Sequence, residues 1–205
     1  MRMMALVGSW LFVLVLSVLS PAKAAEHCAF SEVHQEILAL HSGLVPRFEQ
    51  YAKEQGYFSD CAQQVVALHE MLHLVGVQND GFVFESALYQ PRFVPLWQSV
   101  TFADLVRVID SDSAHTGLKR SRIFQDFLVR NPESTLDVLL DEVGAYSQTL
   151  GYIQGDAAAR HYRKRMNEHR QAFLVGWSLL DPQAKRVALS QYRDFFKKLG
   201  LKLKG

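Results

Sequence analysis

The sequence predicts a compact, mainly α-helical single domain of the α+β class, in which one small β-hairpin or sheet accompanies the helices. Apolar residues recur at helical spacing in most segments, which indicates amphipathic helices. Short turn signals built from Gly, Pro, Asn and Asp separate these segments, and the chain shows no internal repeat or long linker. Hydrophobic residues make up 49% of the 205 residues, which is enough to fill one core and excludes a disordered chain.

The first 24 residues have the pattern of a secretory signal peptide. Arg2 precedes an apolar run over 5–19 that is too short to span a bilayer comfortably, and Ala22-Lys23-Ala24 is the small-x-small pattern of a cleavage site. Residues 25–205 are therefore expected to form the domain of a periplasmic or secreted protein, without stable membrane insertion after signal cleavage. An uncleaved membrane anchor is the alternative interpretation of this segment.

The charge balance excludes a nucleic-acid-binding class. Cleavage after residue 24 would remove Arg2 and Lys23 and no acids, so Lys+Arg falls from 22 to 20 against 21 Asp+Glu, a net charge of 20 − 21 = −1. A nearly neutral chain has no global field that attracts nucleic acid or anionic lipid. A local basic tail is expected to be a solvated helix end; it contains Lys197, Lys198, Lys202 and Lys204.

The chain has two cysteines, Cys28 and Cys61. An exported protein folds in an oxidising compartment, so a disulfide between them is expected, which would tie the N-terminal segment to the following helix. Neither cysteine lies in a recognisable nucleophile context, which disfavours a catalytic thiol.

The first half of the domain predicts three helices and a turn. Ser31 can cap a helix that runs to Leu40, and a second short helix is expected over 46–54. A third helix begins after Ser59 or Asp60 and continues through Val75. Beyond it, Asn79-Asp80-Gly81 is a turn signal, and Phe82–Tyr89 is rich enough in aromatic and branched residues to be a strand or hairpin arm.

The second half is expected to be more regular. A helix is predicted over 101–109, a polar loop over 111–119, and a helix that ends at Asn131-Pro132. Ser134, with Asp137 three residues later, is expected to begin the next helix. A long helix should follow Gly155-Asp156, and Asp181-Pro182 should begin the last one. Two aromatic groups are interpreted as core rather than partner surface: Phe195-Phe196, and Trp97 with Phe93.

The third helix carries the sequence His-Glu-x-x-His. His69 and His73 are four residues apart, so both imidazoles lie on one face and can bind one ion, while Glu70 is rotated toward a metal-bound water. Zinc lowers the pKa of such a water and the carboxylate takes its proton. The other residues from Val66 to Val75 are uncharged, as expected for a buried helix in which the three polar groups need a partner. The alternative is an amphipathic helix with two incidental histidines.

This segment resembles the active-site helix of the zincin metallopeptidases, over about fifteen residues. Metzincins add a third His, but the sequence after His73 has Gly76 and no His following it. The gluzincin branch, which includes thermolysin, takes a Glu from a later helix, commonly in Glu-x-x-Ala. The downstream glutamates are Glu85, Glu133, Glu142 and Glu168, and only Glu142-Val143-Gly144-Ala145 fits that pattern within a convincing helix. The resemblance therefore implies a zincin-like metallohydrolase domain over 25–205, with Zn²⁺ held by His69, His73 and Glu142.

The resemblance also implies a donor to the developing oxyanion. The candidates are Tyr146, His161, Tyr162 and His169, with His115 a weaker one. The chain departs from thermolysin-like enzymes in a longer interval between His73 and Glu142, of 142 − 73 = 69 residues, and in the lack of an obvious strand set before the motif. Phe82–Tyr89 could instead supply the strand that pairs with an extended peptide.

These observations predict an exported zinc metallopeptidase that hydrolyses a protein or peptide substrate, with Glu70 as general base. A non-catalytic zinc-binding assembly or binding protein of the envelope is the alternative, although a structural zinc site does not need Glu70. A zinc hydrolase that acts on a cell-wall peptide or another amide is a third possibility, which the sequence does not separate from the first.

Overall fold

The computed structural model describes residues 28–84, 87–89, 95–153 and 155–204. The predicted signal segment and Phe93 lie outside these ranges. Over these ranges the chain forms a mainly α-helical single domain with one antiparallel hairpin, which confirms the predicted fold class. The elements in chain order are α1 (Glu32–Leu40), α2 (Val45–Glu54), α3 (Asp60–Gln78), β1 (Phe82–Phe84), β2 (Ala87–Tyr89), α4 (Pro95–Gln98), α5 (Phe102–Ser111), η1 (Ser113–His115), α6 (Thr116–Lys119), η2 (Ile123–Leu128, a π-helical turn), α7 (Leu136–Thr149), η3 (Leu150–Tyr152), α8 (Asp156–Leu179) and α9 (Pro182–Lys198).

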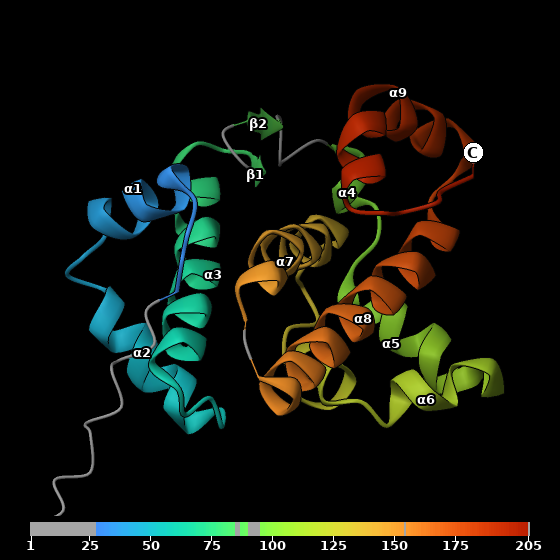
Figure 1. Ribbon diagram of the computed structural model, residues 1–205. Coiled ribbons are helices and arrows are strands. Elements are labelled where there is room, and N and C mark those ends of the chain that lie inside the picture. Colours follow the sequence, from blue (N-terminus) through green and yellow to red (C-terminus); the bar gives the residue numbers. More distant parts are fainter. Residues whose placement is uncertain (1–27, 85–86, 90–94, 154, 205) are drawn as a thin grey trace, which may run out of the picture.

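Helix α7 lies at the centre of the molecule, between α3 and α8 (Figure 1). Helices α1 and α2 flank the outer side of α3, whereas α5 and α6 lie beyond α8 and α9 lies above it (Figure 1). Among the described residues, the buried apolar side chains form two groups. One surrounds α3 and includes Ala145 of α7, and the other joins α5, α7, α8 and α9. Helix α7 contributes side chains to both groups, so it lies between them.

The start of α3 is fixed by a cap and a disulfide. Ser59 accepts a hydrogen bond from the backbone N–H of Ala62, which satisfies one of the free amides of the first turn. The predicted disulfide between Cys28 and Cys61 is present, with the two Cα atoms 4.9 Å apart. The N-terminal segment is therefore tied to the first turn of the helix that carries His-Glu-x-x-His.

Two predictions about the connections before α7 were wrong. The stretch 111–119 is not a polar loop: Asp112 accepts a hydrogen bond from the N–H of Ala114, and the side chain of Leu118 is buried, so the chain forms η1 and α6. Helix α7 has Thr135 instead of Ser134 as its N-cap, because the carbonyl of Ser134 accepts from the N–H of Phe102 and holds that residue in the link to α5.

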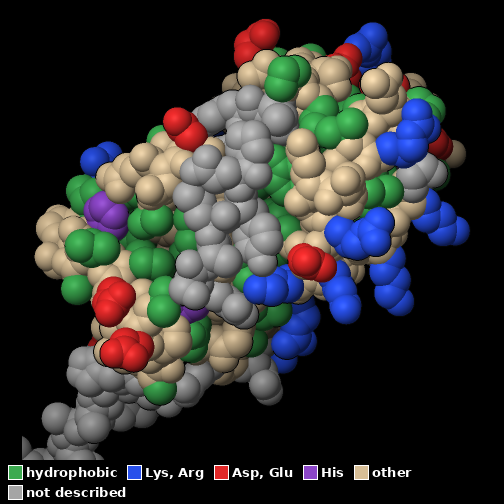
Figure 2. Space-filling model, turned by 90° about the horizontal axis from the view of Figure 1, so that it is seen from above, with side chains coloured by type: hydrophobic (Ala, Val, Ile, Leu, Met, Phe, Trp, Pro, Cys, Tyr) green, Lys and Arg blue, Asp and Glu red, His purple; other side chains and the backbone are tan. Residues whose placement is uncertain are grey.

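The hairpin and the C-terminal helix pack together. Strand β1 pairs with β2 in the register Phe82↔Tyr89, and Asp80 adopts a left-handed conformation in the turn before it. The ring of Phe82 stacks on Phe195 of α9 at 5.6 Å, and Phe195, Phe196 and Trp97 are buried, as predicted. The four tail lysines are exposed, and Figure 2 shows basic side chains gathered at the α9 end.

Helices α7 and α8 approach closely at Gly176. A Cβ atom at this position would lie 2.5 Å from a methyl carbon of Leu136 and 3.3 Å from one of Leu105, so any larger residue would force the buried Leu136 side chain to shift. This contact fixes α8 against α7 and α5. Among the described helices, none combines the length and the apolar composition that a bilayer crossing requires.

Candidate metal centre

Three side chains from two helices converge beside the α3–α7 contact. The Nε2 atoms of His69 and His73 are 3.1 Å apart, and the Glu142 carboxylate lies 3.3 Å from the first and 3.5 Å from the second. One ligand atom from each residue lies within 4.8 Å of the others, so the group could hold a metal ion. The structure therefore brings together the three residues that the sequence singled out as metal ligands.

The two small residues that follow Val143 on α7 face different neighbours. Ala145 is buried in the group of apolar residues around α3. Gly144 faces the other way, where a Cβ would lie 3.5 Å from Phe195 of α9. Ala145 is thus the small residue of Glu142-Val143-Gly144-Ala145 that faces the histidine helix.

A chain of hydrogen bonds determines which nitrogen of His69 carries the proton. The hydroxyl of Thr149 donates to the carbonyl of Ala145 at 2.7 Å, so its only proton is used there. Tyr162, whose oxygen is 2.6 Å from Thr149 Oγ1, must then donate to Thr149. It accepts in turn from His69 Nδ1–H at 3.1 Å. The neutral imidazole therefore presents an unprotonated Nε2 to Glu142 and His73.

The proton of His73 is assigned by a carboxylate. Its Nδ1 donates to Asp141 Oδ2 at 2.7 Å, because an ionised carboxylate only accepts. Burial alone lowers the pKa of His73, but the carboxylates of Glu142 and Asp141 outweigh burial and raise the pKa to about 9. Burial likewise favours the neutral form of Glu142, yet His73, His169 and His69 hold its pKa well below the ordinary value.

The neutral histidines and the carboxylate present only acceptor atoms to one another, so a cation is needed between them. Without a metal, a proton on His73 Nε2 meets this need by donating to His69, and a bound metal would replace that proton. Two imidazoles and one carboxylate are the ligand set of catalytic zinc sites, which leave a fourth position open. Carboxylates or hydroxyls behind the ligand histidines are the usual supports, and Asp141 and Tyr162 supply them here. The residues fit a zinc ion.

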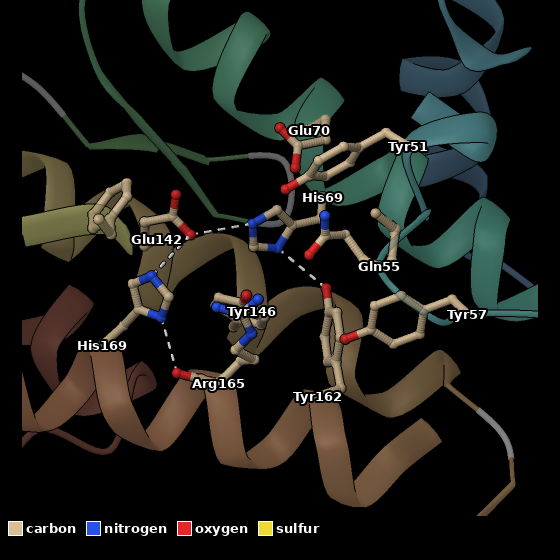
Figure 3. A pocket seen from close by; sticks show the side chains of 12 residues that line it. Tyr51, Gln55, Tyr57, His69, Glu70, Glu142, Tyr146, Tyr162, Arg165 and His169 are labelled. Carbon is tan, nitrogen blue, oxygen red and sulfur yellow. Dashed lines mark hydrogen bonds and ion pairs between the residues drawn. The ribbon is translucent and has the colours of Figure 1, made fainter. Parts of the chain in front are cut away.

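A cavity of about 290 Å³ adjoins this group. Figure 3 shows His69 and Glu70 facing it from α3, with Glu142 from α7 and three side chains from α8, namely Tyr162, Arg165 and His169. Tyr51 lies beside Glu70 on the wall (Figure 3), and burial together with the Glu70 charge raises the pKa of Tyr51. Glu70 therefore lines the space in which a substrate would meet the metal group.

Three of the predicted oxyanion donors, Tyr146, Tyr162 and His169, line the cavity. The Tyr146 ring lies 4.4 Å from that of His69, and His169 Nε2 lies 3.6 Å from the Glu142 carboxylate. The Tyr162 hydroxyl is bonded to His69 and Thr149, so this residue orients the His69 ring instead of facing a substrate.

His161 and His115 do not line the metal-site cavity. His161 contacts the Tyr57 ring and lines a separate hollow with Phe58. His115 lies in η1, where it is 3.9 Å from Asp112. The described strand β1 also contributes no residue to the cavity wall, so Phe82–Phe84 does not provide the expected peptide-binding edge there.

The sequence prediction missed several residues that complete the site. The structure shows that Asp141 and Glu142, which are neighbours on α7, both contact His73. The only sequence signal for Asp141 was its place next to Glu142. Thr149 had no sequence signal, because its role depends on the packing of α8 against α7. Arg165 was one of several basic residues of α8, and only the fold shows that it lines the cavity.

Comparison of the chain with protein families, with curated proteins and with solved structures gave no match.

Proposed function

We propose that the protein is an exported zinc-dependent metallopeptidase in which His69, His73 and Glu142 bind the zinc and Glu70 is the general base. One observation carries the proposal: two oriented imidazoles and a carboxylate converge as acceptors at the wall of a cavity that Glu70 also lines. A purely structural zinc site would have its ligands closed off and would have no use for a carboxylate beside an open position. The disulfide is compatible with an exported protein.

The chemistry assigns a role to each side chain of the cavity. When bound, zinc supplies Lewis acidity that polarises a substrate carbonyl and lowers the pKa of water. Glu70 takes the proton from the attacking water and delivers it to the departing amine. Asp141 and Tyr162 hold the two imidazoles in the required tautomer.

Tyr146 is the better candidate for the oxyanion donor. Burial raises its pKa well above the ordinary value, so the phenol keeps its proton and can donate it in a hydrogen bond. His169 uses its Nδ1–H for the carbonyl of Arg165 at 2.9 Å, so the neutral ring has no proton on the Nε2 that faces the site. We therefore assign oxyanion stabilisation to Tyr146.

Metal analysis and peptide cleavage test this function together. The wild-type protein should contain one zinc per chain, measured by plasma mass spectrometry, and should cleave members of a diverse peptide library. Glu70→Gln should retain the zinc and lose cleavage by about 100-fold or more, because it removes the general base. Glu36→Gln, an exposed acid-to-amide change on α1, is the matched control and should be fully active. A zinc-loaded wild type that cleaves no peptide would instead support a binding module, and a wild type without zinc affinity would reject the site.

A further inference from the structure

A second hollow of about 390 Å³ lies next to the metal-site cavity. The two spaces share part of their walls, namely Tyr51, Gln55, Phe127 and Arg165. The rest of the second wall comes from η2 and the residues that flank it: Arg122, Asp126 and Arg130. We use the term arginine groove for the part formed by Arg122, Asp126, Arg130 and Arg165. A substrate that reaches from the metal group past Arg165 would enter this groove.

The groove has an excess of positive charge. Its three guanidinium groups face one carboxylate, that of Asp126, which lies 3.5 Å from Arg122 and 3.4 Å from Arg130. The formal charge of these four side chains is therefore 3 − 1 = +2. Since the domain after signal cleavage would carry a charge near zero, this local excess is a property of the groove and not of the whole surface.

Arg165 differs from the other two arginines in its surroundings. Its side chain is half-buried, whereas those of Arg122 and Arg130 are 58% and 72% exposed. Among the described residues it forms no ion pair: the nearby Glu168 is paired with Lys164 at 3.9 Å. Burial raises the pKa of Tyr57 to about 12, and the positive charge of Arg165 opposes this rise. Since Tyr57 lines the cavity, the charge of Arg165 acts on groups inside it. Figure 3 shows Arg165 extending from α8 between His169 and Tyr162.

A half-buried guanidinium without a carboxylate partner favours an anionic ligand. Burial strips water from the charge, and a carboxylate that binds two of its N–H groups compensates for that loss. The tyrosine and phenylalanine rings around Arg165 leave apolar walls for a peptide backbone and its side chains. Arg122 and Arg130 continue the positive potential outward, where further acidic residues of the same peptide would lie.

We propose that the arginine groove selects acidic peptides, with Arg165 binding a substrate carboxylate close to the bond that is cleaved. This inference rests on the proposed peptidase function and names its substrate class. The carboxylate is that of an acidic side chain or of the peptide C-terminus; the chemistry of recognition is the same, and the experiment separates the two sources.

Binding is measured with zinc-loaded Glu70→Gln protein, so that no probe is cleaved during the titration. The probes are peptides of equal length that contain either glutamate or glutamine next to a central bond, each with a free or an amidated C-terminus. Isothermal titration calorimetry should show roughly tenfold or tighter binding of the carboxylate-containing member, since hydrogen bonds to charged groups have about this effect. The preference should weaken as ionic strength rises.

Arg165→Gln in the same background should abolish the difference in affinity between the glutamate and glutamine peptides, or between free and amidated C-termini. Its zinc content and its melting temperature should stay the same. Arg163→Gln is the matched control, because this exposed arginine of α8 lines neither hollow. Arg165→Lys should retain part of the preference, because it keeps the charge but loses the paired N–H groups.

The outcomes separate the two proposals. If the wild type cleaves peptides while Arg165→Gln leaves the ratio of acidic to amide binding unchanged, the substrate-class inference is overturned and the peptidase proposal stands. If acidic peptides bind through Arg165 but no zinc-loaded protein cleaves any of them, the peptidase proposal is overturned and the recognition of carboxylates by the groove stands.

Discussion

His73 Nδ1 lies 2.7 Å from the carboxylate of Asp141, while His73 Nε2 lies 3.5 Å from the carboxylate of Glu142. Two consecutive residues of α7 therefore contact both nitrogens of one imidazole on α3. One carboxylate orients the ring, and the other completes the group that could hold the metal.

Asp141→Asn should weaken zinc binding by roughly 10- to 100-fold, because the amide no longer fixes His73 as a donor from Nδ1. Competition titration with a chromophoric chelator measures the change. Asp110→Asn, at an exposed ion pair with Lys119, is the control and should bind zinc like the wild type. Equal affinities for wild type and Asp141→Asn would show that Asp141 does not support the ligand.

The metal-free protein should contain a histidinium at neutral pH. Burial disfavours the charged form of His73, but the carboxylates of Glu142 and Asp141 overcome burial and raise the pKa from the ordinary 6.5 to about 9. A raised pKa in the folded state stabilises the fold fully below pH 6.5, and this stabilisation is lost as pH rises through about 9. NMR titration of the chelator-treated protein and urea unfolding between these pH values would measure both effects. A His73 whose pKa stays near that of an exposed histidine would contradict the prediction.

Tyr162→Phe should lower zinc affinity by about tenfold or more, because it removes the acceptor that holds His69 in its tautomer. It also leaves the buried His69 Nδ1–H without an acceptor, which should lower the unfolding free energy by about 1–3 kcal/mol. Tyr57→Phe is the matched control, since Tyr57 lines the same cavity without bonding to either histidine. Identical behaviour of the two variants in the chelator assay would exclude this role for Tyr162.

Replacing both Cys28 and Cys61 with alanine should lower the unfolding free energy by about 3–4 kcal/mol, since the disulfide closes a loop with a sequence separation of 33. Urea unfolding of the variant and of the oxidised wild type gives the difference. Zinc stoichiometry should be unchanged while the variant is folded, because neither sulfur belongs to the metal group. A variant as stable as the wild type would show that the bond does not constrain the unfolded chain.

Gly176→Ala should destabilise the protein by about 1–3 kcal/mol, because the new methyl group would overlap Leu136 at the contact of α8 with α7. Thermal unfolding measures the loss. Gly117→Ala is the same change in α6, where nothing lies within 4 Å, and it should be neutral or slightly stabilising. If both variants melted together, the close approach at Gly176 would not limit packing.

Much of the fold follows from local signals that the sequence displays. Ser59 and Asp181 act as helix caps at the predicted positions, and the turn at Asp80 leads into the hairpin. These features depend on neighbours within a few residues, which is why a single sequence contains them. The N-cap of α7 was predicted incorrectly because the carbonyl of Ser134 bonds to Phe102, a partner 32 positions away (134 − 102 = 32).

The metal group shows the same division. His69 and His73 are four apart on one helix, so their common direction follows from helical geometry alone. Glu142 was identified by resemblance, and the structure places it beside them. The supports and the groove were not predictable in this way, because Thr149 and Arg165 meet the site only through the packing of α7 and α8.

The hydrogen-bonded chain from Ala145 through Thr149 and Tyr162 to His69 joins residues of α7, α8 and α3. An isolated peptide with the sequence of α3 would contain both histidines and Glu70. It would lack the Glu142 carboxylate, and nothing would fix the tautomer of His69. If the group binds zinc, its affinity would therefore depend on the assembled helices, and the unfolded chain should release the ion. By mass action, free zinc at 100 times its dissociation constant would add about 2.7 kcal/mol to the stability of the domain. Metal supply would then set how long the folded protein survives, as well as whether its site is filled.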